Sequence, residues 1–181
     1  RTHRCERRGD DPPGDPAMLR FRDAVADGAV PFTVQGPENA LCLDGGRTIG
    51  WEMSEALDDA PLDAVFVQVG GGAFAACVGG GLLAAPDGRV PALHAVQAAG
   101  WAPLDQAWRM GADASTDWAV AMPRWADPHS RADGILDDET YAWSGGLDAI
   151  RATGGDSVVA GETRIERAWD LARSAGFDCS P

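Results

Sequence analysis

Residues 62–75 read LDAVFVQVGGGAFA, and this stretch decides the fold class of the chain. The first eight residues form a nearly continuous apolar run of strand length, which predicts a parallel strand that is buried on both faces. Three glycines follow at 70–72, and an apolar, helix-like run begins at Ala73. A second strand-like run, PALHAV, occupies residues 91–96. The order strand, glycine turn, helix, strand predicts a βαβ unit with a right-handed crossover, and therefore an α/β fold.

Weaker patterns on either side of this unit extend the same fold. Asp15 followed by Pro16 is typical of an N-cap and the first residue of a helix, which we expect to end near Gly28. Further helices are expected at 48–57, 104–109, 138–152 and 162–175, short strands at 31–35 and 157–159, and a loop at 36–47. The glycines at 79–81 and 145–146 are expected to loosen the helices that contain them. The last helix is expected to bury positions 165, 168, 169, 171 and 172.

Composition and charge exclude several classes of function. The 181 residues are 45% hydrophobic, which is enough for one core of ordinary size, and the net charge is −13. A chain this acidic repels phosphate backbones and anionic lipids, so we expect neither nucleic-acid nor membrane partners. No apolar run approaches the roughly 18 residues of a membrane span. All 15 basic residues are arginine, which excludes any mechanism that needs a lysine within this chain.

The cysteines and histidines do not form a metal-binding pattern. The cysteines at 5, 42, 77 and 179 contain no CxxC pair, and the histidines at 3, 94 and 129 are scattered along the sequence. We therefore expect reduced, mostly buried thiols in a cytoplasmic protein and no metal site. We expect His94, inside a strand-like run, to have a structural role.

The glycine turn at 70–72 is the feature that carries chemistry. Glycines expose backbone N–H groups, and here they lie at the start of a helix, so the turn has the properties of a main-chain phosphate site. A tight turn that only needs small residues is the structural alternative. Gly70-x-Gly72-x-x-Ala75 also fits the dinucleotide fingerprint, although Gln97 stands where that fingerprint requires a carboxylate. The phosphate loop of Walker type is excluded because it requires a lysine.

A longer ordered set of segments resembles one enzyme family. The stretch VQVGGGAFA at 67–75 resembles the polyglycine phosphate loop of fold-type II pyridoxal-phosphate enzymes, which include threonine synthase, serine/threonine dehydratase and cysteine synthase. RADGI at 131–135 resembles the Ala-Asp-Gly-Ile segment of the dehydratases. The strand at 157–159 and the helix that follows Glu162 resemble their late strand and helix, and the segments at 35–39 and 46–52 resemble the approach to the glycine strand. The resemblance covers roughly residues 5–180 in order.

The resemblance implies a fold, a cofactor and a set of site residues. It implies a three-layer parallel sheet with flanking helices that is incomplete at both ends. Residues 1–35 would return from the smaller domain, and residues 36–181 would form part of the large cofactor-binding domain. The cofactor would be pyridoxal 5′-phosphate, with its phosphate held by the backbone N–H groups of Gly70, Gly71, Gly72, Ala73 and Phe74. Gln35 is a weaker candidate for the substrate or cofactor side. We do not assign the cation site of the dehydratases to this chain, because they often have a glutamate where Gln97 stands.

The resemblance also implies an activity that this chain cannot complete. The full-length protein would be a lyase that catalyses β- or γ-elimination or replacement on a hydroxy-amino acid or its phosphate ester. The Schiff-base lysine, the asparagine at the phenolic oxygen and the Ser or Thr at the pyridine nitrogen would all lie outside these 181 residues. We therefore expect a fragment of a longer, amino-acid-metabolising enzyme that is inactive alone, has a small amino-acid substrate, and is compatible with a homodimer. A dinucleotide-binding domain and a non-catalytic α/β interaction fragment remain the alternatives.

Overall fold

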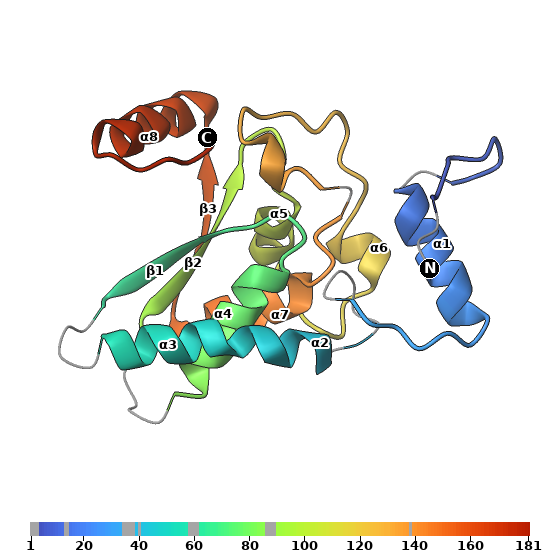
Figure 1. The fold of residues 1–181 in the computed structure, drawn as a ribbon, viewed down its shortest axis with the longest axis horizontal. Helices are drawn as coiled ribbons and strands as arrows, with labels where there is room; N and C mark the ends of the chain where they lie inside the picture. The colour runs from blue at the N-terminus through green and yellow to red at the C-terminus, as the bar shows by residue number, and fades with distance from the viewer. Residues whose placement is uncertain are drawn as a thin grey trace.

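The computed structural model describes residues 4–12, 15–33, 39, 41–57, 62–85, 90–137 and 139–181. The described residues form one parallel sheet from β1 (Ala64–Gln68), β2 (Ala92–Ala98) and β3 (Ser157–Ala160), in the order β1-β2-β3. The register pairs Val67 with Ala95 and Val96 with Val158. The predicted βαβ unit and the α/β fold class are confirmed (Figure 1).

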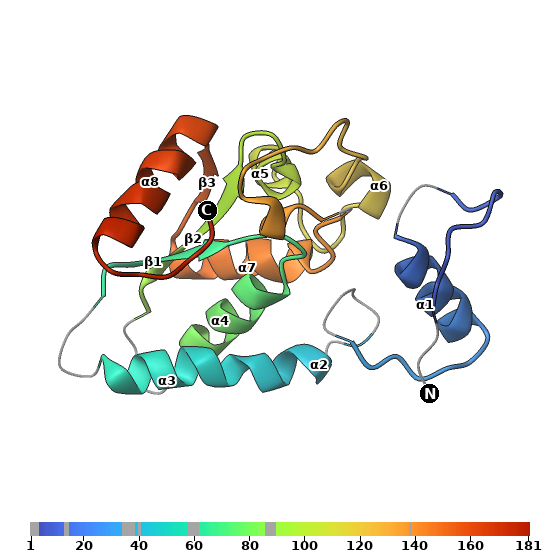
Figure 2. The same ribbon diagram turned by 45° about the horizontal axis from the view of Figure 1, so that its top comes forward.

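Helices cover the two faces of this sheet unequally. The helical elements are α1 (Pro16–Ala26), α2 (Leu41–Asp44), η1 (Gly45–Arg47), α3 (Thr48–Ala56), α4 (Ala73–Leu83), α5 (Pro103–Arg109), α6 (Trp118–Ala121), η2 (Asp133–Ile135), α7 (Trp143–Thr153) and α8 (Glu162–Ser174). Figures 1 and 2 show α4 and α7 packed together on one side of the sheet, with α3 outside α4, and α8 on the other side. Helix α1 stands apart from the sheet, at the opposite end of the molecule from α8.

The core lies mainly on the face that α4 and α7 cover. Val65 and Val67 of β1 point into it and are buried, whereas Phe66 is 66% exposed on the opposite face. The prediction that this strand is buried on both faces is therefore wrong for the described structure. Among the described strands β1 is an edge strand, and α8 leaves a cavity above the outer face of the sheet. The Phe66 ring stacks on the His94 ring at a centroid distance of 4.9 Å, which gives His94 a structural contact within the sheet.

Glycines allow the helices of the core to approach closely. Helix α4 runs unbroken through 79–81, contrary to the expectation that these glycines loosen it. A side chain at Gly79 would overlap the Cβ of Ala149 in α7, and one at Gly81 would overlap the backbone carbonyl of Arg47. Close helix contact thus compensates for the helix-weakening effect of glycine. Helix α7 likewise continues through 145–146.

The expected element boundaries hold at some ends and fail at others. Asp15 is the N-cap of α1 as predicted, and its carboxylate accepts hydrogen bonds from Ala17 N at 2.7 Å and Met18 N at 3.1 Å. Residues 41–47, expected as a loop, are helical in α2 and η1. Residues 31–33 are not a strand, and 34–35 lie outside the described part of the chain.

Two further expectations about helices need correction. The helix expected from 138 begins at Trp143, because residues 140–142 instead pack on the glycine turn. Leu171, expected inward, is 70% exposed, and α8 has no fully buried residue because it stands off the sheet. Within the described residues, none of the helices has both the length and the apolar character that a membrane span needs.

Candidate active site at the glycine turn

The glycine turn lies at the carboxyl edge of the parallel sheet. The N–H of Val69, just after β1, donates to the carbonyl of Val96 at 2.9 Å, and α4 begins at Ala73. Gly72 is the N-cap of α4 with φ of 87°, a left-handed conformation that other residues rarely adopt. In open α/β sheets ligands bind outside the carboxyl ends of the strands, so the turn occupies the edge where a ligand is expected.

The N–H groups of the turn donate no hydrogen bond to another described residue. Among the described residues, no hydrogen bond takes as donor the N–H of Gly70, Gly71, Gly72, Ala73 or Phe74. The first N–H groups of a helix have no acceptor inside the helix, and the partial positive charge of the helix start adds to their attraction for an anion. The five predicted residues therefore form a continuous row of main-chain donors at the start of the 11-residue helix α4.

A neighbouring stretch of chain, which we call the covering segment (residues 130–137 and 139–142), packs on this turn. An added Cβ at Gly70 would lie 3.0 Å from the carbonyl oxygen of Ile135. At Gly71 it would lie 3.2 Å from the ring of Tyr141 and 3.3 Å from the carboxylate of Asp137. The glycines are thus also required by close packing, which was the structural alternative for this turn.

The covering segment is bonded to the turn at its carboxyl end. The N–H of Ala142 donates to the carbonyl oxygen of Gly71 at 2.8 Å. The methyl carbon of Thr140 lies 3.0 Å from the position that a Cβ of Gly72 would take. These contacts hold the turn in one conformation, and they do not use its N–H groups as hydrogen-bond donors. Sequence reasoning did not anticipate this cover, because the residues that form it lie far from the turn along the chain.

Glu162 fixes the other end of the covering segment. Its carboxylate accepts a hydrogen bond from the Ser130 hydroxyl at 2.7 Å and one from the N–H of Arg131 at 2.9 Å. These two hydrogen bonds hold the pKa of Glu162 below its usual range, and the bond from the Arg131 N–H has the larger effect. The Arg131 guanidinium also pairs with Glu166 at 2.7 Å. The RADGI stretch singled out in the sequence is therefore anchored to the start of α8, and its Ile135 reaches the glycine turn.

Gln97 is a structural residue that links β1 to α5. Its side chain is 1% exposed. Its amide nitrogen donates to the carbonyl of Val69 at 3.3 Å, and its amide oxygen accepts from the N–H groups of Leu104 at 2.8 Å and Asp105 at 3.2 Å. Both ends of the amide are used inside the protein, so this side chain is not available to bind a ribose or a cation.

Replacing Gln97 by leucine is expected to lower the free energy of unfolding by about 3 kcal/mol, because it leaves one carbonyl and two N–H groups buried without a partner. Urea unfolding followed by tryptophan fluorescence measures this change. Gln106→Leu is the control, since Gln106 lies exposed on α5. Equal stability of the two variants would contradict the structural role of Gln97.

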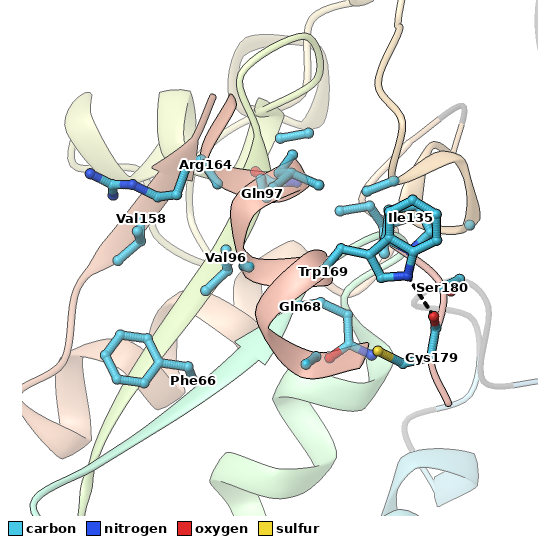
Figure 3. Close-up of a pocket in the computed structure, with 18 residues that line it drawn as sticks. Phe66, Gln68, Val96, Gln97, Ile135, Val158, Arg164, Trp169, Cys179 and Ser180 are labelled. Atoms are coloured by element: carbon cyan, nitrogen blue, oxygen red, sulfur yellow. Dashed lines mark hydrogen bonds between the residues drawn. The ribbon is translucent and has the colours of Figure 1, made fainter. Parts of the chain in front are cut away.

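A large cavity lies on the outer face of the sheet, beside the glycine turn. It has a volume of about 730 Å³ and is mostly apolar. Figure 3 shows Gln68 of β1 near Trp169 of α8, with Ile135 of the covering segment also near Trp169, while Phe66 lies further back along β1. The Trp169 indole N–H donates to the carbonyl of Cys179 at 2.7 Å, which ties the last residues of the chain to α8. The five residues of the turn do not line this cavity. Ile135 lines the cavity and also packs on Gly70 of the turn.

The remaining candidates add no catalytic group. Gln35 lies outside the described residues. The four cysteines are free thiols; Cys77 is buried and Cys179 exposed, so the expectation of mostly buried thiols holds only in part. Burial raises the pKa of the Cys77 thiol, which keeps it protonated and a poor nucleophile at neutral pH. The described residues contain no group of three or more His, Cys, Asp or Glu side chains placed to hold a metal.

Comparison with known families decides what the chain is. A model of the pyridoxal-phosphate dependent enzyme family matches residues 3–181. The chain belongs to the pyridoxal-phosphate-dependent enzymes. Its cofactor class is therefore the one that the sequence resemblance implied. No curated protein sequence matches the chain.

Solved structures place this pyridoxal-phosphate-dependent enzyme chain within fold type II. Maize serine racemase has a TM-score of 0.64 at 18% identity, over 92% of this chain and 45% of its own. The L-serine ammonia-lyase of Rhizomucor miehei has a TM-score of 0.63 at 21% identity, over 78% and 42%. The serine racemase of Dictyostelium discoideum has a TM-score of 0.57 at 18% identity, over 79% and 41%. A threonine deaminase from T.th. has a TM-score of 0.61 at 19% identity. The chain thus spans less than half the length of these structures, and the likeness concerns the fold.

The residues present fit the phosphate end of pyridoxal phosphate. The N–H groups from Gly70 to Phe74 have no acceptor among the described residues. They are neutral main-chain donors at the positive end of α4. The aldehyde end of the cofactor needs an amine, and the 181 residues contain no lysine. This pyridoxal-phosphate-dependent enzyme chain therefore contains residues suited to one end of its cofactor and none suited to the other.

Proposed function

We propose that this chain forms the phosphate-binding part of a pyridoxal-phosphate-dependent lyase that acts on a hydroxy-amino acid or its phosphate ester. Membership in the family supports the cofactor. The structures that share the fold include a serine racemase, an L-serine ammonia-lyase and a threonine deaminase, which supports serine- or threonine-like substrates. Elimination or replacement at the hydroxyl-bearing carbon is the reaction class that such substrates undergo.

The observation that carries this proposal is the row of five N–H groups at the start of α4 that have no acceptor among the described residues. In the proposed role these groups hold the phosphate and so orient the rest of the cofactor along the carboxyl edge of the sheet. When bound, the cofactor supplies the electron sink that the reaction needs. The covering segment keeps the turn in shape through Ala142 and shields it from one side through Ile135 and Tyr141.

A titration of the isotopically labelled chain with pyridoxal 5′-phosphate tests this role. The backbone amide resonances of residues 70–74 are expected to shift the most, because their N–H groups would gain an anion as hydrogen-bond acceptor. Pyridoxal, which lacks the phosphate, is the control ligand and is expected to leave these resonances unchanged. Shifts confined to other parts of the chain would overturn the proposal.

Asp137→Asn is expected to tighten binding in the same titration about tenfold. The Asp137 carboxylate lies 3.3 Å from the Cβ position of Gly71, so it adds negative charge beside the proposed anion site. The asparagine keeps the shape of the side chain and removes the charge. Asp133→Asn, at an exposed position of the same segment, is the matched control. Unchanged affinity in Asp137→Asn would place the phosphate elsewhere.

The 181-residue chain supplied with pyridoxal phosphate is expected to show no turnover of serine, threonine or phosphohomoserine above that of the free cofactor. The reaction needs a lysine amine that the chain does not contain. Release of ammonia or phosphate, measured against a blank with cofactor alone, checks this. Turnover above the blank would contradict the assignment of the chain as a part that depends on residues outside it.

A further inference from the structure

Glu162 connects helix α8 to the covering segment. It is the first residue of α8 and follows β3, which ends at Ala160. Its Oε1 atom accepts a hydrogen bond from the Ser130 hydroxyl at 2.7 Å, and its Oε2 atom accepts one from the Arg131 N–H at 2.9 Å. Both oxygens of one side chain thus bind two successive residues at the start of the covering segment.

Ser130 extends this contact towards the glycine turn. While its hydroxyl donates to Glu162, its oxygen accepts a hydrogen bond from the N–H of Ala132 at 3.1 Å. The carbonyl oxygen of Ala132, a buried residue, accepts in turn from the N–H of Ile135 at 3.3 Å. An added Cβ at Gly70 would lie 3.0 Å from the carbonyl oxygen of Ile135, so Ile135 packs directly on the turn. A continuous series of contacts therefore joins the Glu162 carboxylate to the turn.

We propose that Glu162 is a positioning residue for the phosphate site at the glycine turn. It fixes the start of the covering segment, which holds Ile135 against Gly70 and so keeps the N–H groups of the turn in the arrangement that binds the phosphate. Donors that are already in place need no reorganisation when the ligand arrives, which raises affinity. The proposal rests on the proposed phosphate role of residues 70–74, and it adds that a side chain of α8 sets the affinity of that site.

A role confined to α8 is the structural alternative for Glu162. The start of a helix carries a partial positive charge that favours an acidic side chain, and Gly161 at the N-cap makes no side-chain hydrogen bond. That role depends on the negative charge of Glu162, whereas the positioning role depends on its reach to two hydrogen-bonding groups. Two conservative substitutions at this position change charge and reach separately, so they distinguish the two roles.

Titration of the isotopically labelled chain with pyridoxal 5′-phosphate, followed at the amide resonances of residues 70–74, tests the proposal. Glu162→Asp keeps the charge but is shorter by about 1.5 Å, and it is expected to weaken binding about tenfold. Glu162→Gln removes the charge but keeps the reach, since its amide oxygen can accept from the Arg131 N–H and its amide nitrogen can donate to the Ser130 oxygen. We expect its affinity to stay within about twofold of that of the unaltered chain.

Glu166→Asp is the matched control for the shortened side chain. Glu166 lies one turn further along α8 and pairs with the Arg131 guanidinium at 2.7 Å, but the two side chains are 44% and 58% exposed. Exposed ion pairs contribute little, so the cofactor affinity is expected to change less than about twofold. Before any ligand is added, Glu162→Asp is also expected to shift the resonances of residues 70–72, which Glu166→Asp should leave in place. Thermal unfolding of each variant shows that its fold is intact.

The outcomes separate this proposal from the proposed function. Unchanged affinity in Glu162→Asp, while the unaltered chain binds the cofactor through residues 70–74, would overturn the positioning role and leave the phosphate site in place. Weaker binding by Glu162→Gln than by Glu162→Asp would show that the charge at the start of α8 is what matters, and would also overturn it. If the unaltered chain itself showed no shifts at residues 70–74, the proposed function would fail, and the positioning role would fail with it.

Discussion

Replacing Gly71 by aspartate is expected to weaken pyridoxal phosphate binding in the full-length enzyme by about a thousandfold, while the fold survives. The phosphate is a dianion, and the turn offers it only neutral N–H dipoles and a helix start. A carboxylate at about 4 Å from the phosphate adds repulsion on the order of 4 kcal/mol at an effective dielectric constant near 20. Titration with pyridoxal phosphate, followed by the visible absorbance of the bound cofactor, measures the loss.

Gly71→Asn is the matched control for this substitution. Both side chains place a Cβ 3.2 Å from the Tyr141 ring and 3.3 Å from the Asp137 carboxylate, so both have the same steric cost in the covering segment. That cost is about 1–2 kcal/mol of stability, which thermal unfolding of both variants monitors. Aspartate and asparagine variants with equal cofactor affinity would show that no phosphate lies at this turn, and the proposed function would lose its main physical support.

The second large effect is expected in the core, where Gly79→Ala should lower the free energy of unfolding by about 3 kcal/mol. The new Cβ would overlap the Cβ of Ala149 in α7 and contact Leu93 at 3.4 Å. Both neighbours are buried, so α4 and α7 would have to move apart. Urea unfolding followed by tryptophan fluorescence measures the change.

Gly80→Ala, one position along the same helix, is the matched control. Both substitutions gain the roughly 1 kcal/mol by which alanine favours a helix over glycine. At position 80 the nearest atom is in the flexible Arg47 side chain at 3.3 Å, so we expect Gly80→Ala to be neutral or stabilising. If Gly79→Ala were equally stable, the close approach of α4 and α7 would be wrong.

Much of the candidate site follows from a short local pattern. The apolar run at 62–69, the glycines at 70–72 and the helix from Ala73 predict a main-chain anion site at the carboxyl edge of a parallel sheet, and the structure has this arrangement of strand, turn and helix. The surroundings of the turn were not predictable. Residues 138–142 were expected to be helical, and nothing in the composition of this region indicates that Ile135 and Thr140 pack on Gly70 and Gly72.

The sequence by itself determined the βαβ order, the N-cap at Asp15 and the family, because each depends on neighbouring residues or on the order of segments along the chain. Only the tertiary structure decided three other matters. In the structure Gln97 joins the end of β1 to α5, α4 is continuous through its glycines, and one face of the sheet lies beneath an open cavity. The physical reason is that hydrogen bonding and burial depend on partners far away in the sequence, whereas strand, turn and cap preferences are set locally.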